Sequence, residues 1–188
     1  GKSAHGAYPE RGINAIEISS RIITAFKDFK FQYKPYPLLR GPTINIGKIE
    51  GGEKVNIVAD YCQFEVDLRY LPGMDKNDVI FTIKSIIQKY AKKFRIEFAD
   101  IQKPYSLKEN HPLVRRFLKA AKANGVSAKI KGSEGATVIT FFQENKIPAI
   151  SFGCGSSGCA HIKNEYVRID NIYKGAKLLE HVLKNFVA

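Results

Sequence analysis

The stretch Ile44-Asn45-Ile46-Gly47-Lys48-Ile49-Glu50-Gly51-Gly52 predicts one strand and the turn that ends it. Its apolar residues alternate with polar ones, as in a half-buried strand, and two consecutive glycines favour a turn. The segment 55–71 contains the partner strand, which Pro72-Gly73 ends. On one face this partner strand places Cys62, Phe64, Val66 and Leu68.

One amphipathic helix is predicted before these two strands in the sequence, and another after them. Apolar residues recur at helical spacing through 13–29, and a second apolar stripe, which Asp75 or Asn77 can cap, follows the second strand. Residues 95–101 alternate again as a last strand. With an opening strand at the start of the chain, the order is β-α-β-β-α-β, the split βαβ arrangement of ferredoxin-like folds.

The pattern changes near residues 104–109, so we divide the chain into domains 1–107 and 108–188. In the second domain a helix is expected to begin at Pro112, because proline suits the first helical turn. Strands here alternate with helices, which predicts an α/β half-domain with a locally parallel sheet. The further elements expected are a strand at 128–131, a helix at 136–144, a buried strand at 149–152 and a helix from 170.

Composition places the chain among globular proteins. Its 188 residues are 44% hydrophobic, enough for one or two domains, and no run of about 18 apolar residues predicts a membrane helix. The net charge of +12 suggests nucleic acid, but the lysines are spread over helical faces and turns, which is typical of a solvated surface. We therefore expect neither a nucleic-acid nor a membrane partner.

The three cysteines are too few for a secreted disulfide scaffold and favour a reducing, cytoplasmic location. Cys154 and Cys159 flank a small-residue loop just before His161. Three interpretations stay open for them: ordinary thiols, a loop disulfide, or a Cys-x4-Cys-x-His metal cluster, which would still need a fourth ligand.

His161 follows a buried strand and a glycine-rich loop, a setting that suits a metal ligand whose ring must be aimed without crowding. Neutral imidazole binds zinc without adding charge. The alternative is a histidine that is merely hydrogen-bonded in its loop. Glu165 would orient this loop or serve as a capping or solvent-exposed group.

Several stretches together resemble one family, the dinuclear zinc amidohydrolases typified by acetylornithine deacetylase, succinyl-diaminopimelate desuccinylase and carboxypeptidase G. The resemblance spans essentially the whole chain, and its motifs fall in family order. It implies a lid or dimerisation domain followed by the last part of a catalytic domain. The stretches that carry it are 1–9, 12–16, 44–52, 56–60, 67–70, 147–153 and 160–167.

The resemblance also implies parts that these residues lack. Family members carry a His-x-Asp motif, a bridging Asp and a Glu-Glu pair upstream of the point that matches Gly1, which would lie inside the opening strand of the lid. We therefore expect the intact enzyme to be larger and to use two zinc ions, with cobalt as a second option. A metal-bound water, deprotonated by an upstream glutamate, would attack the amide. This chain alone should be inactive.

Roles for individual residues follow from the same resemblance. His161 would bind the second zinc, and His5 would reach across a homodimer to stabilise the tetrahedral oxyanion in the partner's active site. Arg69 would clamp a substrate carboxylate, with Asn45 as an amide donor to the same group. Ser133, in a loop where the family usually has Gly-Thr-Asp-Ala, would hold an anionic group.

Each of these residues also has a plainer interpretation. His5 would be a surface histidine, Arg69 would form a surface pair with Asp67, and Asn45 would serve only the strand or a turn. Glu134 stands where the family usually has aspartate, which leaves the substrate open.

For the intact protein we expect a metallopeptidase-like hydrolase that cleaves the amide bond of N-acyl amino acids, as a deacetylase or desuccinylase, or of short peptides. The alternative is a non-catalytic dimerisation or binding module that retains the fold. RNA binding is disfavoured, because the strand 63–67 carries acidic residues where exposed aromatic residues would be needed.

Overall fold

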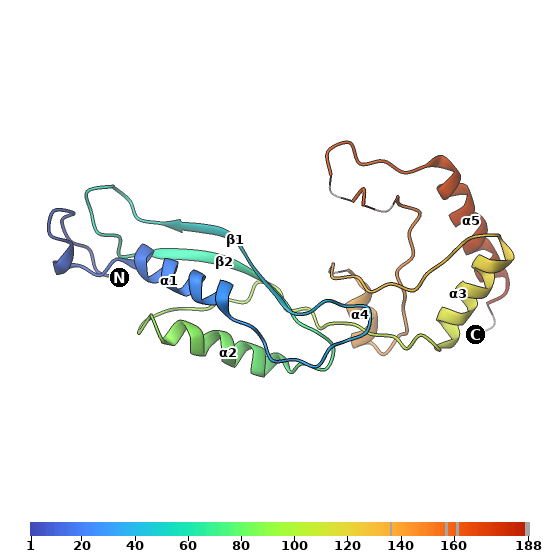
Figure 1. Ribbon diagram of the computed structural model, residues 1–188, viewed down its shortest axis with the longest axis horizontal. Coiled ribbons are helices and arrows are strands. Elements are labelled where there is room, and N and C mark those ends of the chain that lie inside the picture. The colour runs from blue at the N-terminus through green and yellow to red at the C-terminus, as the bar shows by residue number, and fades with distance from the viewer. Residues whose placement is uncertain (136, 157, 161, 187–188) are drawn as a thin grey trace. The chain divides into compact units, whose positions relative to one another are not determined.

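The computed structural model describes residues 1–135, 137–156, 158–160 and 162–186, which divide into two units, 1–104 and 105–188. Figure 1 shows the order of the elements along the chain. The first unit contains η1 (Pro9–Arg11), α1 (Ala15–Asp28), β1 (Thr43–Gly51), β2 (Cys62–Arg69) and α2 (Lys76–Gln88). The second contains α3 (Pro112–Ala123), α4 (Ile139–Glu144) and α5 (Ile169–Lys184).

A β-bulge in β1 keeps the apolar side chains of the hairpin on one face. The two strands pair antiparallel, and their register shifts between Ile46 and Lys48. Directly opposed residues share a face, so the shift brings Ile49 opposite Phe64, onto the face that already holds Ile46. The simple alternation predicted for 44–49 would have placed Ile49 on the opposite face.

Helix α1 covers this apolar face of the hairpin, and α2 packs beside α1 and completes the core (Figure 1). Each helix begins at a side-chain cap: Asn14 Oδ1 accepts the Ile16 N–H at 2.9 Å, and Asp75 Oδ1 accepts the Asn77 N–H at 2.6 Å. Phe26 is 2% exposed and packs edge-to-face on Phe64. The buried residues of this core are Ile22, Phe26, Ile86, Ile87 and Ala91.

The outer strands of the predicted β-α-β-β-α-β order are not formed as strands. Residues 2–5 make only two isolated bridges, Lys2 with Ile13 and His5 with Ile57, and residues 95–101, all of them described, form no strand. Ile96 still packs against the core. Apolar alternation thus located the half-buried side chain at 96. A strand also needs a hydrogen-bonding edge, which this segment does not reach.

The core of the second unit joins α3 to α5. The helix predicted at Pro112 is confirmed, with proline in its first turn and the His111 side chain accepting the Leu113 N–H at 3.2 Å. The helix expected from 170 begins at Ile169, and the one expected over 136–144 begins only at Ile139. The buried residues shared by α3 and α5 are Ala120, Ala121, Leu178 and Val182.

The strands predicted at 128–131 and 149–152 are not formed, and all of these residues are described. Strands of a parallel sheet need neighbours from other crossover units, and the described part of this unit offers no strand to pair with. At Ala149 the Tyr105 hydroxyl bonds the backbone groups that a neighbouring strand would bond. It donates to Ala149 O at 2.6 Å and accepts the Ala149 N–H at 2.7 Å.

None of the helices within the described residues has the length and apolar content that a membrane crossing requires.

Candidate functional site

The hairpin face opposite to the one that α1 covers carries polar side chains. Because β2 alternates regularly, Asp67 and Arg69 lie on the face opposite to Phe64. Asn45 is directly opposite Asp67, and Thr43 is directly opposite Arg69, so all four share that face. The register therefore brings together two of the predicted site residues, Asn45 and Arg69.

Arg69 and Asp67 form a two-bond ion pair on this face. Arg69 Nε donates to Asp67 Oδ1 and Arg69 Nη2 donates to Asp67 Oδ2, each at 2.7 Å. The side chains are 40% and 51% exposed, respectively. Hydrogen bonding to Asp67 raises the pKa of Arg69 above its already high ordinary value. The guanidinium is therefore a fixed positive group, held along one of its edges.

Toward the connecting loop of the hairpin, the same face carries a chain of hydrogen bonds. Tyr61 Oη donates to Gln63 Oε1 at 2.7 Å, and Gln63 Nε2 donates to Glu50 Oε2 at 2.9 Å. Lys48 Nζ lies 2.8 Å from Glu50 Oε1 and 3.8 Å from Glu65 Oε1. The hydrogen bond from Lys48 lowers the pKa of Glu50, and the one to Glu50 raises the pKa of Lys48.

His5 is held at the loop that connects β1 to β2. Its Nδ1 accepts the Ala7 N–H at 3.0 Å, so the neutral ring carries its proton on Nε2, which is then a hydrogen-bond donor. The Gly6 N–H donates to Asn56 O at 2.7 Å. A Cβ at Gly6 would lie 2.9 Å from the Asn56 carbonyl, so the close approach of the two segments requires glycine.

His5 and Arg69 lie at opposite ends of the hairpin. Residues 4–6 contact residues 56–58 of the connecting loop, whereas Arg69 is the last residue of β2 (Figure 1). A strand rises about 3.4 Å per residue, which puts Cys62 and Arg69 roughly 24 Å apart. A single copy of the chain therefore holds these two groups too far apart for both to touch one N-acyl amino acid.

The remaining predicted site residues lie in the second unit. Ser133 is exposed, and its Oγ accepts the Gly135 N–H at 3.2 Å. It is not adjacent to a helix start, because α4 begins only at Ile139. His161, the predicted zinc ligand, lies outside the described residues. Among the described residues no three His, Cys, Asp or Glu side chains come together as a metal site would require.

The described residues of the second unit line a cavity of about 450 Å³ with mainly apolar side chains of α3, α4 and residues 149–152, and no described member of the predicted site residues lines it. A smaller cavity, about 220 Å³, is lined by residues 155–156, 159–160 and 165–167. There the Ser156 hydroxyl is buried and has no hydrogen-bond partner among the described residues. Cys154 is a free thiol, so the loop disulfide considered from the sequence is not formed.

The structure adds Asn56, which the sequence analysis did not select as a site residue. Its carbonyl anchors the loop of His5, and its side chain is exposed beside that loop. The available signal was its place in the stretch 56–60, one of those that carry the family resemblance.

Comparison with known proteins places the chain in a family. Residues 1–95 match the family model of the M20 peptidase dimerisation domain. The acetylornithine deacetylases of Edwardsiella ictaluri and Vibrio atlanticus are 30% and 26% identical over 99% of this chain, which covers 50% of either relative. The chain thus spans about half the length of the curated relatives it matches.

Solved structures share the fold. The aminopeptidase PepT of Bacillus cereus superimposes with a TM-score of 0.77 at 23% identity, over 97% of this chain and 48% of that one. An M20 family metallo-carboxypeptidase of Sulfolobus solfataricus gives 0.76 at 21% identity, over 98% and 55%. These likenesses confirm the predicted α/β fold class. The family match over residues 1–95 shows that this chain belongs to the M20 family and contains its peptidase dimerisation domain.

Proposed function

We propose that this chain is part of a metal-dependent hydrolase that cleaves the amide bond of N-acyl amino acids or short peptides. Family membership supports an amide hydrolase, and acetylornithine deacetylases match 99% of the chain. The observation that carries the proposal is the uncovered polar face of the hairpin, where Asn45, Asp67 and Arg69 lie together.

On this face Arg69 is the proposed clamp for the free carboxylate of the substrate. A guanidinium presents its donors in a fixed fork that matches a carboxylate, which explains arginine rather than lysine at such a position. Asn45 adds an amide donor on the same face, opposite Asp67. Ser133 is proposed to hold a further anionic group of the substrate.

His5 is proposed to act in a second copy of the chain. The proton on Nε2 makes it a donor suited to the oxyanion of a tetrahedral intermediate. The separation of roughly 24 Å along β2 supports a trans arrangement, because one copy cannot bring His5 and Arg69 to the same substrate. A homodimer through the first unit would supply His5 from one protomer and Arg69 from its partner.

We further propose that the longer protein holds a pair of zinc ions, with His161 as a ligand from this chain. Zinc bound at that site would polarise the scissile carbonyl. Because the described residues form no metal cluster, most ligands would come from outside this chain, and residues 1–188 alone should hydrolyse nothing.

Hydrolysis of N-acetyl-L-ornithine and other N-acetyl-L-amino acids by the longer protein tests the proposal. We expect activity that a chelator abolishes and that added zinc restores. Replacing His5 with Ala should lower kcat about 10²–10³-fold, as loss of an oxyanion donor does. The matched control is His181→Ala on α5, which should leave kcat unchanged.

Two results would contradict the proposal. If the zinc-loaded longer protein hydrolyses no N-acyl amino acid or short peptide, the chain is a non-catalytic dimerisation module. If His5→Ala and His181→Ala reduce kcat equally, the role of His5 is wrong while the hydrolase assignment stands.

A further inference from the structure

Arg69 already holds a carboxylate of its own chain. Both oxygens of Asp67 accept from it, at 2.7 Å each, and the two residues are neighbours on one strand face. The proposed function gives Arg69 a second carboxylate to bind, that of the substrate. The chemistry of the guanidinium decides whether these two carboxylates compete or bind together.

A guanidinium carries five N–H groups in one plane. Asp67 occupies the edge formed by Nε and one N–H of Nη2. The other edge, formed by Nη1 and the second N–H of Nη2, presents two parallel donors of the kind that bind a carboxylate bidentately. A substrate carboxylate can therefore approach Arg69 without displacing Asp67.

We propose that Asp67 is a positioning residue for substrate binding: it fixes one edge of the Arg69 guanidinium so that the other edge faces the substrate carboxylate. The inference rests on the proposed function. Arginine has a long side chain with many rotamers, and holding it before the substrate arrives reduces the conformational entropy lost on binding.

The pair also affects selectivity. Asp67 compensates the charge of Arg69, so the surface around this pair attracts anions in general less strongly than a lone arginine would. Binding then depends on the two parallel hydrogen bonds, which a planar carboxylate accepts and a carboxamide does not. Asn45 is directly opposite Asp67 in the register and therefore lies beside the same pair.

The test uses the longer enzyme with N-acetyl-L-ornithine and its α-carboxamide as probes. Arg69→Ala should raise KM for the acid about 10–100-fold, as loss of a charged bidentate contact does. Asp67→Asn keeps one acceptor but turns an amide NH2 toward Arg69, and should raise KM about 2–10-fold with kcat nearly unchanged. For the carboxamide, both variants should behave like the parent enzyme.

The matched control is Glu97→Gln. Glu97 pairs with Arg95 at the same spacing of two residues in the same unit, and its loss changes the net charge equally. Its KM should equal that of the parent enzyme. A thermal melt of every variant shows whether it is folded. If Asp67→Asn does not fold, Asp67→Ser takes its place in the test. On the 188-residue chain, slow exchange of the Arg69 Nε–H should report the pair directly, and the exchange should be faster in Asp67→Asn, where the acceptor is uncharged.

The outcomes separate the inference from the proposed function. If Arg69→Ala raises KM while Asp67→Asn leaves it unchanged, Asp67 does not position Arg69; if Asp67→Asn lowers KM, Asp67 competes with the substrate. In either case the inference is wrong, whereas the carboxylate clamp stands. If Arg69→Ala leaves KM unchanged, the clamp and the inference both fail, but the hydrolase assignment stands. Absence of hydrolysis by the parent enzyme overturns all three.

Discussion

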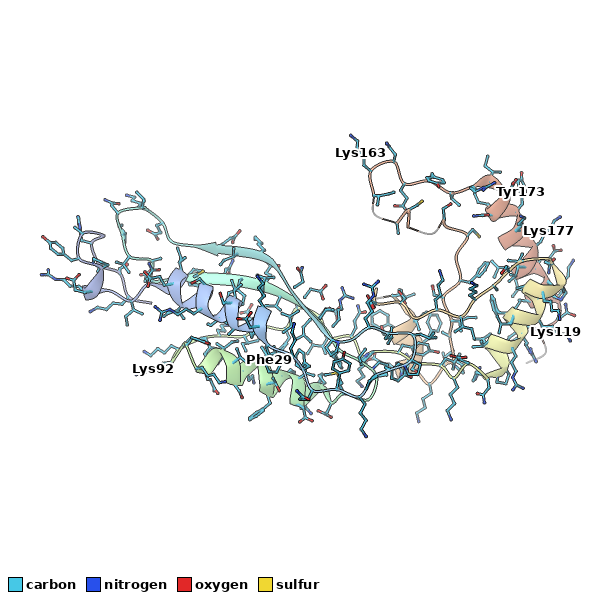
Figure 2. The ribbon with its side chains drawn as sticks, viewed as in Figure 1. Phe29, Lys92, Lys119, Lys163, Tyr173 and Lys177 are labelled. Atoms are coloured by element: carbon cyan, nitrogen blue, oxygen red, sulfur yellow. The ribbon has the colours of Figure 1, made fainter. Side chains whose placement is uncertain are left out.

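The first unit builds its core from two helices and a two-stranded sheet, whereas the described residues of the second build theirs from two helices and form no strand. In residues 1–104, two helices and two strands meet around Phe26, which is 2% exposed. In residues 105–188, the core joins α3 to α5, while Ile169 is 69% exposed and Leu183 is 72% exposed. Tyr173, on the same helix α5, is also exposed (Figure 2).

The difference follows from how each unit obtains strand neighbours. Consecutive antiparallel strands give each other a hydrogen-bonding edge, so β1 and β2 complete a sheet that α1 can cover, with α2 beside it. The segments 128–131 and 149–152 read as strands of a parallel sheet, whose neighbours must come from further crossover units. A hairpin is thus self-contained, and a parallel strand is not.

The largest effect is expected at the closed core of the first unit. Phe26→Ala removes a buried ring that packs on Phe64 and should lower the free energy of unfolding of this unit by about 3–5 kcal/mol. Urea unfolding followed by amide signals of α1 and α2 measures it. The control Phe81→Ala, at a side chain 71% exposed, should change little. Equal effects of the two variants would show that the core is not closed.

A smaller effect is expected at Gly175, where the second unit is tightly packed, and the change in stability should reverse its sign when Cys154 is replaced. A Cβ at Gly175 would lie 2.2 Å from Cys154 Sγ, so Gly175→Ala should cost about 1–3 kcal/mol through overpacking. In a Cys154→Ala background the sulfur is absent, and the same change should stabilise α5 by up to about 1 kcal/mol through helix propensity. Thermal melts of the four proteins test this. The same sign in both backgrounds would contradict the contact.

A further test concerns a buried polar group in the first unit. The Tyr70 hydroxyl is buried and has no hydrogen-bond partner among the described residues, and burial followed by the charge of Asp75 raises its pKa. Tyr70→Phe should therefore be neutral or stabilising by up to about 1 kcal/mol. Tyr61→Phe, which removes a hydroxyl bonded to Gln63, should be slightly destabilising. A clear loss of stability in Tyr70→Phe would mean that the hydroxyl has a partner.

The smallest effect concerns the exposed Lys48–Glu50 pair. The pKa of Glu50 is lowered in the folded chain, so its contribution is present above the ordinary carboxyl value of 4.5 and is lost as the pH falls through the lowered value. The melting temperatures of the parent chain and Glu50→Gln should thus differ slightly near neutral pH and converge in acid. A difference that grows on acidification would contradict the direction of the shift.

Elements that depend on near neighbours in the sequence were predicted correctly. The helices over 13–29 and from Pro112 are present nearly as expected, because apolar periodicity and end signals are local. The bulge at Gly47 was missed, since alternation over so few residues does not reveal a slip of one position. The strands at 95–101 and 149–152 were wrong, because their apolar patterns are real but pairing depends on distant chain segments.

Site residues divide in the same way. The Asp67–Arg69 pair was foreseen as one alternative, because two residues apart on a strand means one face. That Asn45 shares this face, and that His5 lies at the far end of the hairpin, depends on the register and the connecting loop, which composition and spacing do not determine.

Mixing two inactive variants of the longer enzyme tests the central claim most directly. His5→Ala and Arg69→Ala proteins, each nearly inactive at low substrate concentration, are dissociated together and reassembled. If His5 acts in the partner's site, each mixed dimer regains one complete site, with Arg69 from one protomer and His5 from the other, and activity returns. If both residues serve the site of their own protomer, no mixed dimer holds a complete site, activity stays absent, and the account is wrong.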